Sequence, residues 1–272
     1  MAMSTLKIRD LTLEPGKPKI AVPIVSADPK DIIAECESVK NMPCDMIEWR
    51  ADGYLGAMED PEGAMGEKDF YLDLIKILDD INYIAAGTPL IFTIRSKDQG
   101  GGVELTDEHL ASIRGLVAQS GLVDLVDVEF SGKDAAGEKE IVTRQIDEIH
   151  KHSCRVVLSH HDFDGMPRAE EIVETVRSMA ALDGDMFKFA AMAATKEDSE
   201  KLLKATAFLS RNGIGPLIMI AMGEMGKPAR VAAGRYGSCV TFASGKEASA
   251  PGQVDVYTMK KWLDDYYDGK EN

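Results

Sequence analysis

Short apolar segments alternate with longer amphipathic segments along the whole chain. The short segments are rich in β-branched residues and predict strands over 19–25, 46–50, 89–94, 122–130, 155–159, 186–191, 216–222 and 239–243. Apolar residues at helical spacing predict helices over 29–40, 69–86, 107–119, 135–151, 168–182, 196–211, 228–233 and 255–267. Because the strands are apolar almost without interruption, we expect a parallel sheet that is covered on both faces.

Eight strand–helix units of about 34 residues each predict an α/β fold, a (β/α)8 TIM barrel. A doubly wound open sheet is the alternative, and it would carry a glycine-rich phosphate loop after the first strand. The segment in that place, VSADPKD (residues 25–31), contains no glycine, which favours the barrel. No linker-like segment divides the chain, so we expect one barrel domain over residues 1–272, with its longest loop over 56–69.

A short segment lies ahead of the first unit, LKIRDLTLEPGKPK (residues 6–19). It predicts a β-hairpin that turns at Pro15 and Gly16, because proline and glycine favour tight turns. We expect this hairpin to close the bottom of the barrel, at the N-terminal ends of the strands.

The charge balance is strongly acidic: 46 Asp and Glu residues against 31 Lys and Arg residues give a formal net charge of −15. Such a surface repels phosphate backbones and anionic lipids, so we expect neither nucleic acid nor a membrane as a partner. No apolar run approaches the roughly 20 residues that span a bilayer, and no signal-peptide core is present. We therefore expect a cytoplasmic protein, in which an anionic small molecule would need local Lys or Arg side chains.

The chain has four cysteines, Cys36, Cys44, Cys154 and Cys239, and none of them forms a CxxC pair. We interpret them as buried thiols rather than as a metal site or a disulfide framework. The five histidines include no HxxxH motif, so we expect no metal.

Polar residues lie at the C-terminal ends of the predicted strands, where (β/α)8 barrels place their active sites. They are Glu48, Arg50, Arg95, Glu129, Ser159, His160, His161 and Lys188, with Ser249 and Gln253 in the loop after the last strand. A convergent ring of polar side chains on an apolar barrel predicts the site of the chemistry.

Lys188 stands out because it lies between two phenylalanines on a strand whose faces should both be covered. An unpaired buried ammonium is costly, so this lysine would tend to lose its proton and could form imines with ketones or aldehydes. The structural alternative is a lysine that pairs with a strand-end carboxylate. His160 and His161 point to opposite faces of a strand, but since both faces are buried, periodicity does not show which one faces the barrel centre.

Several motifs occur in a fixed order: EWRAD (48–52), TIRS (93–96), VDVEF (126–130), SHHDFDGMP (159–167), DMFKFA (185–190) and EASAPGQ (247–253). In this combination the chain resembles the type I 3-dehydroquinate dehydratases, from the N-terminal hairpin to the APGQ loop. The resemblance implies a barrel enzyme without metal or cofactor, commonly a homodimer. It also implies the dehydration of 3-dehydroquinate to 3-dehydroshikimate in the shikimate pathway, on the route to aromatic amino acids.

The resemblance also implies roles for individual residues. Lys188 matches the lysine that forms a Schiff base with the substrate ketone, and His161 matches the general acid and base, while His160 occupies a variable position. The substrate-contacting positions of the family fall on Glu48, Arg50, Arg95, Arg230, Ser249 and Gln253.

The chain departs from the family pattern at a second catalytic position, where the family has a glutamate and this chain has Gln99 in RSKDQGGG. A glutamine carbonyl can accept a hydrogen bond from the imidazole but brings no negative charge, so we expect His161 to be a weaker base with a lowered pKa. Asp98 could compensate if the loop shifted.

Two other functions compete with this one. The first is a homologue that binds the ligand with low activity, because of Gln99. The second is another Schiff-base enzyme of the class I aldolase type, which should carry a phosphate site after strands 7 and 8. The loop there, ASGKEASAPGQ (243–253), matches the dehydratase family better.

Overall fold

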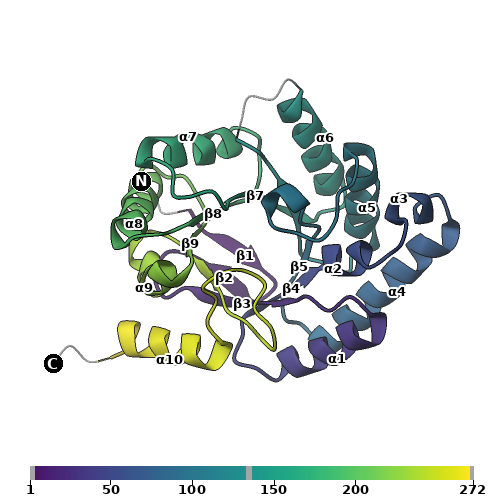
Figure 1. Cartoon of the computed structure of the whole chain (residues 1–272), viewed down its shortest axis with the longest axis horizontal. Helices are drawn as coiled ribbons and strands as arrows, with labels where there is room; N and C mark the ends of the chain where they lie inside the picture. Colours follow the sequence, from purple (N-terminus) through teal and green to yellow (C-terminus); the bar gives the residue numbers. More distant parts are fainter. Residues whose placement is uncertain (1–3, 133–136, 270–272) are drawn as a thin grey trace.

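The computed structural model describes residues 4–132 and 137–269, which form the predicted (β/α)8 barrel (Figure 1). Eight parallel strands lie in the order β10-β3-β4-β5-β6-β7-β8-β9. They are β3 (Lys19–Ile24), β4 (Met46–Arg50), β5 (Leu90–Thr93), β6 (Leu125–Glu129), β7 (Arg155–Asp162), β8 (Met186–Met192), β9 (Leu217–Met222) and β10 (Val240–Phe242). A bridge between Leu217 of β9 and Ser238, two residues before β10, brings the two outer strands together, so the barrel closes and the open-sheet alternative is wrong.

The helices form a ring outside the strands (Figure 1) and begin and end within a few residues of the predicted ranges. They are α1 (Pro29–Lys40), α4 (Lys68–Ala85), α5 (Asp107–Ser120), α6 (Glu138–Lys151), α7 (Ala169–Ala180), α8 (Lys196–Arg211), α9 (Lys227–Ala232) and α10 (Val256–Tyr267). Side-chain caps explain several starts: Asp28 accepts from the backbone of Lys30, and Thr195 caps α8. Predicted helical residues 135 and 136 lie outside the described residues. None of the described helices is both long and apolar enough to cross a membrane.

The segment that was predicted as the longest loop contains helical turns instead. Helix α2 (Ala51–Gly56) follows β4 directly, and α3 (Pro61–Ala64) begins where the Asp60 side chain accepts from the backbone N–H of Gly63. Pro61 fits the first turn of α3, since this position needs no backbone donor. Three short 3-10 helices, η1 (Lys97–Gln99), η2 (Glu224–Gly226) and η3 (Ala233–Tyr236), also lie in connections.

The hairpin closes the bottom of the barrel as predicted, but it does not turn at Pro15 and Gly16. Strands β1 (Leu6–Ile8) and β2 (Leu11–Leu13) pair in an antiparallel register around a two-residue turn, in which Arg9 has a φ of 51°. This register places the apolar residues of both strands on one face. The Arg9 guanidinium then reaches Asp124 at 2.7 Å, which ties the turn to the barrel.

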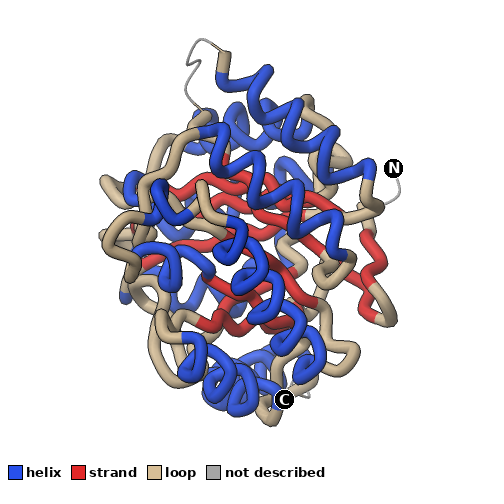
Figure 2. Tube along the Cα trace, turned by 90° about the vertical axis from the view of Figure 1, so that its right-hand side faces the viewer, coloured by secondary structure: helices blue, strands red, loops and turns tan. Residues whose placement is uncertain are grey.

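The inward side chains of β4 to β8 change character along the strand, and this change positions the site. Near the N-terminal ends they are apolar and pack against Ile8 and Leu13 of the hairpin, which Figure 2 shows at one end of the strands. Two residues further along, inward positions become polar, as in the step from Met46 to Glu48 and from Met186 to Lys188. Outward side chains are mostly apolar and form the layer beneath the helices.

Candidate active site

A cavity of about 450 Å³, including its open mouth, lies at the C-terminal ends of the strands. All nine residues to which the family resemblance gives a catalytic or substrate-binding role line it: Glu48, Arg50, Arg95, Gln99, His161, Lys188, Arg230, Ser249 and Gln253. Glu129, Ser159 and His160 of the predicted polar ring do not line it. The rest of its wall is largely apolar and includes Phe163, Met222 and Phe242. The size and mixed lining suit a small polar ligand held by a few directed groups.

Lys188 projects from β8 into this cavity with a relative exposure of only 6%. Its Nζ atom lies 3.5 Å from Glu48 Oε1 and 4.3 Å from the ring centroid of Phe242. Burial lowers the pKa of Lys188 below its usual range; Glu48 opposes this effect and Arg95 adds to it. Lys188 therefore does have a strand-end carboxylate, Glu48, as a partner. The contact of 3.5 Å is long for an ion pair, so the amine is only weakly paired.

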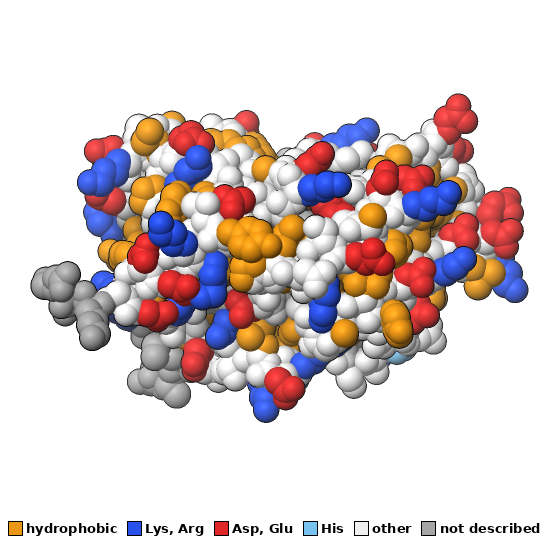
Figure 3. Space-filling view, turned by 90° about the horizontal axis from the view of Figure 1, so that it is seen from below, with side chains coloured by type: hydrophobic (Ala, Val, Ile, Leu, Met, Phe, Trp, Pro, Cys, Tyr) orange, Lys and Arg blue, Asp and Glu red, His pale blue; other side chains and the backbone are white. Residues whose placement is uncertain are grey.

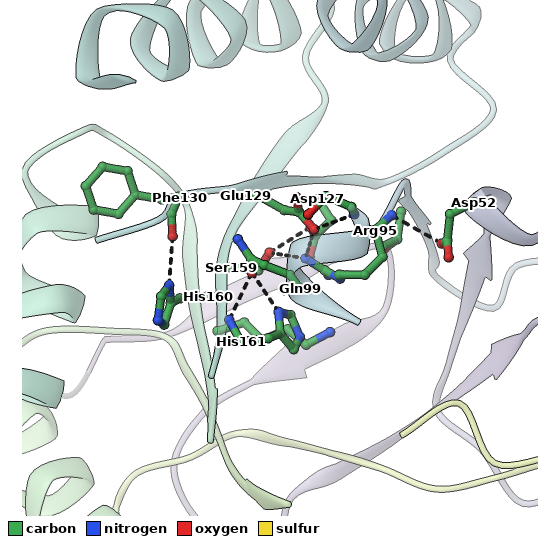
Figure 4. Close-up of polar contacts among 12 residues, drawn as sticks. Asp52, Arg95, Gln99, Asp127, Glu129, Phe130, Ser159, His160 and His161 are labelled. Carbon is green, nitrogen blue, oxygen red and sulfur yellow. Dashed lines mark hydrogen bonds and ion pairs between the residues drawn. The ribbon is translucent and has the colours of Figure 1, made fainter. Parts of the chain in front are cut away.

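The two adjacent histidines face opposite sides of β7, which continues through both of them instead of ending at Ser159. His160 faces outward, where its Nδ1 lies 3.0 Å from the Phe130 carbonyl oxygen and its ring stacks on Phe189. His161 faces the cavity and meets Gln99 from η1 (Figure 4).

Gln99 fixes both the orientation and the proton of the His161 ring. Its Oε1 atom lies 2.9 Å from the backbone nitrogen of His161 and 3.1 Å from Nδ1 of the same residue. The backbone N–H can only donate, so the Gln99 atom that faces it is the acceptor oxygen. Nδ1 must then donate to that oxygen, and in the neutral ring Nε2 keeps its lone pair.

The cavity also favours the neutral form of His161. Burial lowers the pKa of His161 well below its usual range, and the positive charges of Arg95 and Lys188 lower it further. Gln99 adds no negative charge that would oppose these effects. Asp98 is exposed and does not line the cavity, so the structure gives it no compensating role.

Arg95 forms the centre of a buried polar network (Figure 4). Its guanidinium donates to Asp127 at 3.0 Å, to Glu129 at 2.8 Å and to the Ser159 hydroxyl at 2.8 Å. Ser159 in turn donates to Asp127 at 2.8 Å. The donors of Arg95 are therefore largely engaged, and its charge is balanced by two carboxylates.

Arg50 is held at the cavity wall by a bidentate pair with Asp52, at 2.7 and 2.8 Å. The same carboxylate accepts from the backbone N–H groups of Arg95 and Gly102, at 3.2 and 3.1 Å. Asp52 thus joins the Arg50 side chain to the loop that carries Gln99.

Arg230 differs from the other cavity cations. It is 1% exposed, and its Nη2 atom donates to the Pro251 carbonyl oxygen at 2.9 Å. Its Nε atom has no hydrogen-bond partner among the described residues, and no described carboxylate lies within 4.0 Å of it. Burial lowers the pKa of Arg230 to about 10. A buried guanidinium without a counter-ion is a site prepared for an anion.

Comparison with known proteins places almost the whole chain in one enzyme family. The model of a family described as type I 3-dehydroquinase matches residues 20–270. The 3-dehydroquinate dehydratase of Listeria welshimeri is 37% identical over 265 residues, which cover 96% of this chain and 98% of the relative. The chain belongs to the type I 3-dehydroquinase family.

Solved structures of the type I 3-dehydroquinase family have the same barrel. The 3-dehydroquinate dehydratase of Geobacillus kaustophilus superposes with a TM-score of 0.88 at 30% identity, and covers 98% of both chains. The Clostridium difficile enzyme, crystallised with covalently modified comenic acid, gives 0.87 at 29% identity over 98% of this chain and 99% of its own. These relatives support one enzyme class for the chain, type I 3-dehydroquinate dehydratase, as the motifs predicted.

Within this type I 3-dehydroquinase, three polar residues near the cavity were missed at the level of sequence: Asp52, Thr93 and Asp127. Thr93 donates its hydroxyl to Glu48 Oε1 at 2.9 Å, and the two carboxylates hold Arg50 and Arg95. Thr93 could have been found from the two-residue period of a strand, because it lies two residues before Arg95 and therefore faces the same side. Near-continuous apolar strands concealed this alternation.

Proposed function

We propose that the chain converts 3-dehydroquinate to 3-dehydroshikimate through a Schiff base on Lys188, with His161 as the general base and acid. The observation that carries this proposal is the pairing of two groups in one cavity. A buried lysine whose pKa is lowered faces the same space as an imidazole whose Nδ1 proton is fixed by Gln99. The first group suits imine formation and the second suits proton transfer.

The proposed reaction begins when the Lys188 amine adds to the ketone carbon of the substrate. Loss of the carbonyl oxygen as water gives an iminium, which withdraws electrons and acidifies the adjacent C–H bond. Nε2 of His161 removes this proton, and the electron pair expels the hydroxyl group on the next carbon. The protonated His161 gives its proton to that hydroxyl, which leaves as water. A further water hydrolyses the imine and restores the amine.

The charges around the cavity suggest where the rest of the substrate binds. Arg230 lacks a carboxylate partner among the described residues and is proposed to bind the substrate carboxylate. Glu48 and Arg50 are proposed to hold ring hydroxyls, with Arg95 supporting them through its positive charge. Ser249 and Gln253 bond to each other at 2.7 and 2.9 Å and would close the mouth of the cavity.

A single experiment tests the proposal. The chain is mixed with 3-dehydroquinate, product is followed by its enone absorbance, and a parallel sample is reduced with borohydride before peptide mass mapping. We expect enone formation together with a reduced adduct on Lys188. An adduct without enone would instead indicate a binding homologue, and an adduct with a sugar phosphate alone would indicate an aldolase.

Assembly and location complete the proposal. We propose that the enzyme forms a homodimer and works in the cytoplasm. Light scattering coupled to size-exclusion chromatography tests the first part, since a single peak at the monomer mass would contradict it.

A further inference from the structure

We infer that Thr93 is a positioning residue for this reaction: its hydroxyl occupies Glu48 Oε1 and so prevents a close ion pair between Glu48 and Lys188. The inference rests on the proposed Schiff-base function and assigns a residue that the mechanism above does not use. Thr93 has 0% exposure, lies on β5 and does not line the cavity, so it acts on the substrate only through Glu48.

The geometry places two donors on one oxygen atom. Thr93 Oγ1 lies 2.9 Å from Glu48 Oε1, and Lys188 Nζ lies 3.5 Å from the same atom. The hydrogen bonds that reach the Glu48 carboxylate from described side chains both end on Oε1. The threonine therefore makes the ordinary hydrogen bond, while the ammonium stays at the limit of one.

Several lysines elsewhere in the chain approach carboxylates more closely, although the exposed pair of Lys196 and Glu200 lies at 3.9 Å. Basic and acidic side chains are interspersed on the face shown in Figure 3. Exposed pairs join Lys151 to Glu148 at 2.7 Å and Lys201 to Asp198 at 2.8 Å. A buried pair in a medium of low dielectric should attract more strongly than these exposed ones. The longer contact of Lys188 therefore needs a competitor, and Thr93 is the group that holds the shared oxygen.

Thr93 should increase the fraction of Lys188 that is present as the free amine. A close ion pair would stabilise the ammonium form of Lys188, which cannot attack a ketone. By taking part of the acceptor capacity of Oε1, Thr93 weakens that stabilisation. The ring of Phe242, 4.3 Å from Nζ, packs against the same group and is unchanged in a Thr93 variant.

Other charged groups face Lys188 and bear on its protonation. They are Glu48 and Arg50 from β4, Arg95 from β5, Asp127 from β6 and His161 from β7. All of them remain in a Thr93 variant, so a change in the pH profile of such a variant reports on the hydroxyl.

The test compares Thr93→Val, which keeps the shape but removes the hydroxyl, with Thr93→Ser, which keeps the hydroxyl. Each full-length variant is mixed with 3-dehydroquinate across a pH series, reduced with borohydride, and weighed to obtain the fraction carrying the adduct. We expect the midpoint of adduct formation in Thr93→Val to move to higher pH by about half to one unit, with recovery at high pH. Thr93→Ser should retain the wild-type midpoint.

A double variant separates this role from a structural one. In a Glu48→Gln background, Thr93→Val should no longer move the midpoint, because the charge that Thr93 shields is gone. An unchanged midpoint in Thr93→Val, or an equal shift in the Glu48→Gln background, would overturn the inference. Should Thr93→Val not fold, Thr93→Ala carries the same test. If wild-type protein forms no adduct on Lys188 at any pH, the proposed function fails instead.

Discussion

The two ends of the barrel are built by the same strands, yet their inward side chains do different things. At the N-terminal end they are apolar, and Ile8 and Leu13 of the hairpin fill the space between them. At the C-terminal end many of them are polar or charged and surround a cavity, as in the step from Met46 to Glu48 within one strand. Strands β4 to β8 thus each combine a stabilising half and a polar half, whereas the inward residues of β9 and β10 stay apolar.

The difference shows how the molecule separates stability from chemistry. Apolar burial at the closed end stabilises the fold in proportion to the area removed from water. Buried ion pairs at the open end contribute less, because the cost of desolvation offsets much of the attraction. Substitutions at one end should therefore change the free energy of unfolding, and substitutions at the other should change the rate.

The largest expected effect is the loss of turnover in Lys188→Met. This change keeps the length of the side chain but removes the amine, so no imine can form. We expect kcat to fall on the order of 10⁴-fold, measured by the enone absorbance. Lys196→Met, at a side chain that is 82% exposed, is the matched control and should retain full activity. Near-normal turnover in Lys188→Met would refute the assignment of the nucleophile.

At the closed end, Leu13→Ala should lower the stability of the fold and leave the turnover rate unchanged. The removed methyl groups leave a cavity between the hairpin and the strand ends, so the free energy of unfolding should fall by about 2–5 kcal/mol in urea titrations. The kcat of the folded fraction should remain that of the wild type. Thr12→Ala, on the exposed face of the same strand, should change stability little. A loss of kcat in Leu13→Ala without loss of stability would show that the two ends are coupled.

At the open end, Gln99→Glu should raise the turnover rate. A carboxylate that accepts from Nδ1 and the backbone would favour the charged imidazole and raise the pKa of His161, which makes it a stronger base. We expect kcat to rise by about tenfold, whereas Gln99→Met, which lacks the acceptor, should lower it. Equal rates in all three proteins would show that Gln99 does not tune His161.

The smallest expected effect is the contribution of His161 to the pH dependence of the unfolding free energy. The pKa of His161 is lowered in the folded state, so below about pH 6.5 the unfolded chain binds a proton that the folded chain does not. The stability contributed by this residue is present above that pH and is lost as the pH falls. Between pH 7 and 5.5 the wild type should therefore lose about 1 kcal/mol more unfolding free energy than His161→Gln. Parallel losses in the two proteins would contradict the lowered pKa.

The barrel could be predicted from the sequence because its strands and helices follow simple periods. The hairpin turn was misplaced because Pro15 and Gly16 have strong turn propensity, while the actual turn depends on Arg9, which adopts a positive φ and is held by Asp124. That contact joins residues far apart in the chain, and local propensity does not report it.

The candidate site could be predicted in its membership but not in its pairing. The motifs located the residues that line the cavity, including Lys188 and His161. They did not show that Asp127 and Glu129 engage Arg95, or that Arg230 lacks a described carboxylate partner. Such pairing depends on distances between strands, which only the folded barrel defines.

The central claim is that Gln99 holds His161 as a neutral base with its proton on Nδ1 and its lone pair on Nε2. Nitrogen-15 NMR of the imidazole, with His161→Gln used to assign its signals, tests this claim directly. The account predicts a protonated Nδ1 and an unprotonated Nε2 in the free enzyme at pH 7, and still at pH 6. A proton on Nε2, or a doubly protonated ring at pH 6, would contradict it.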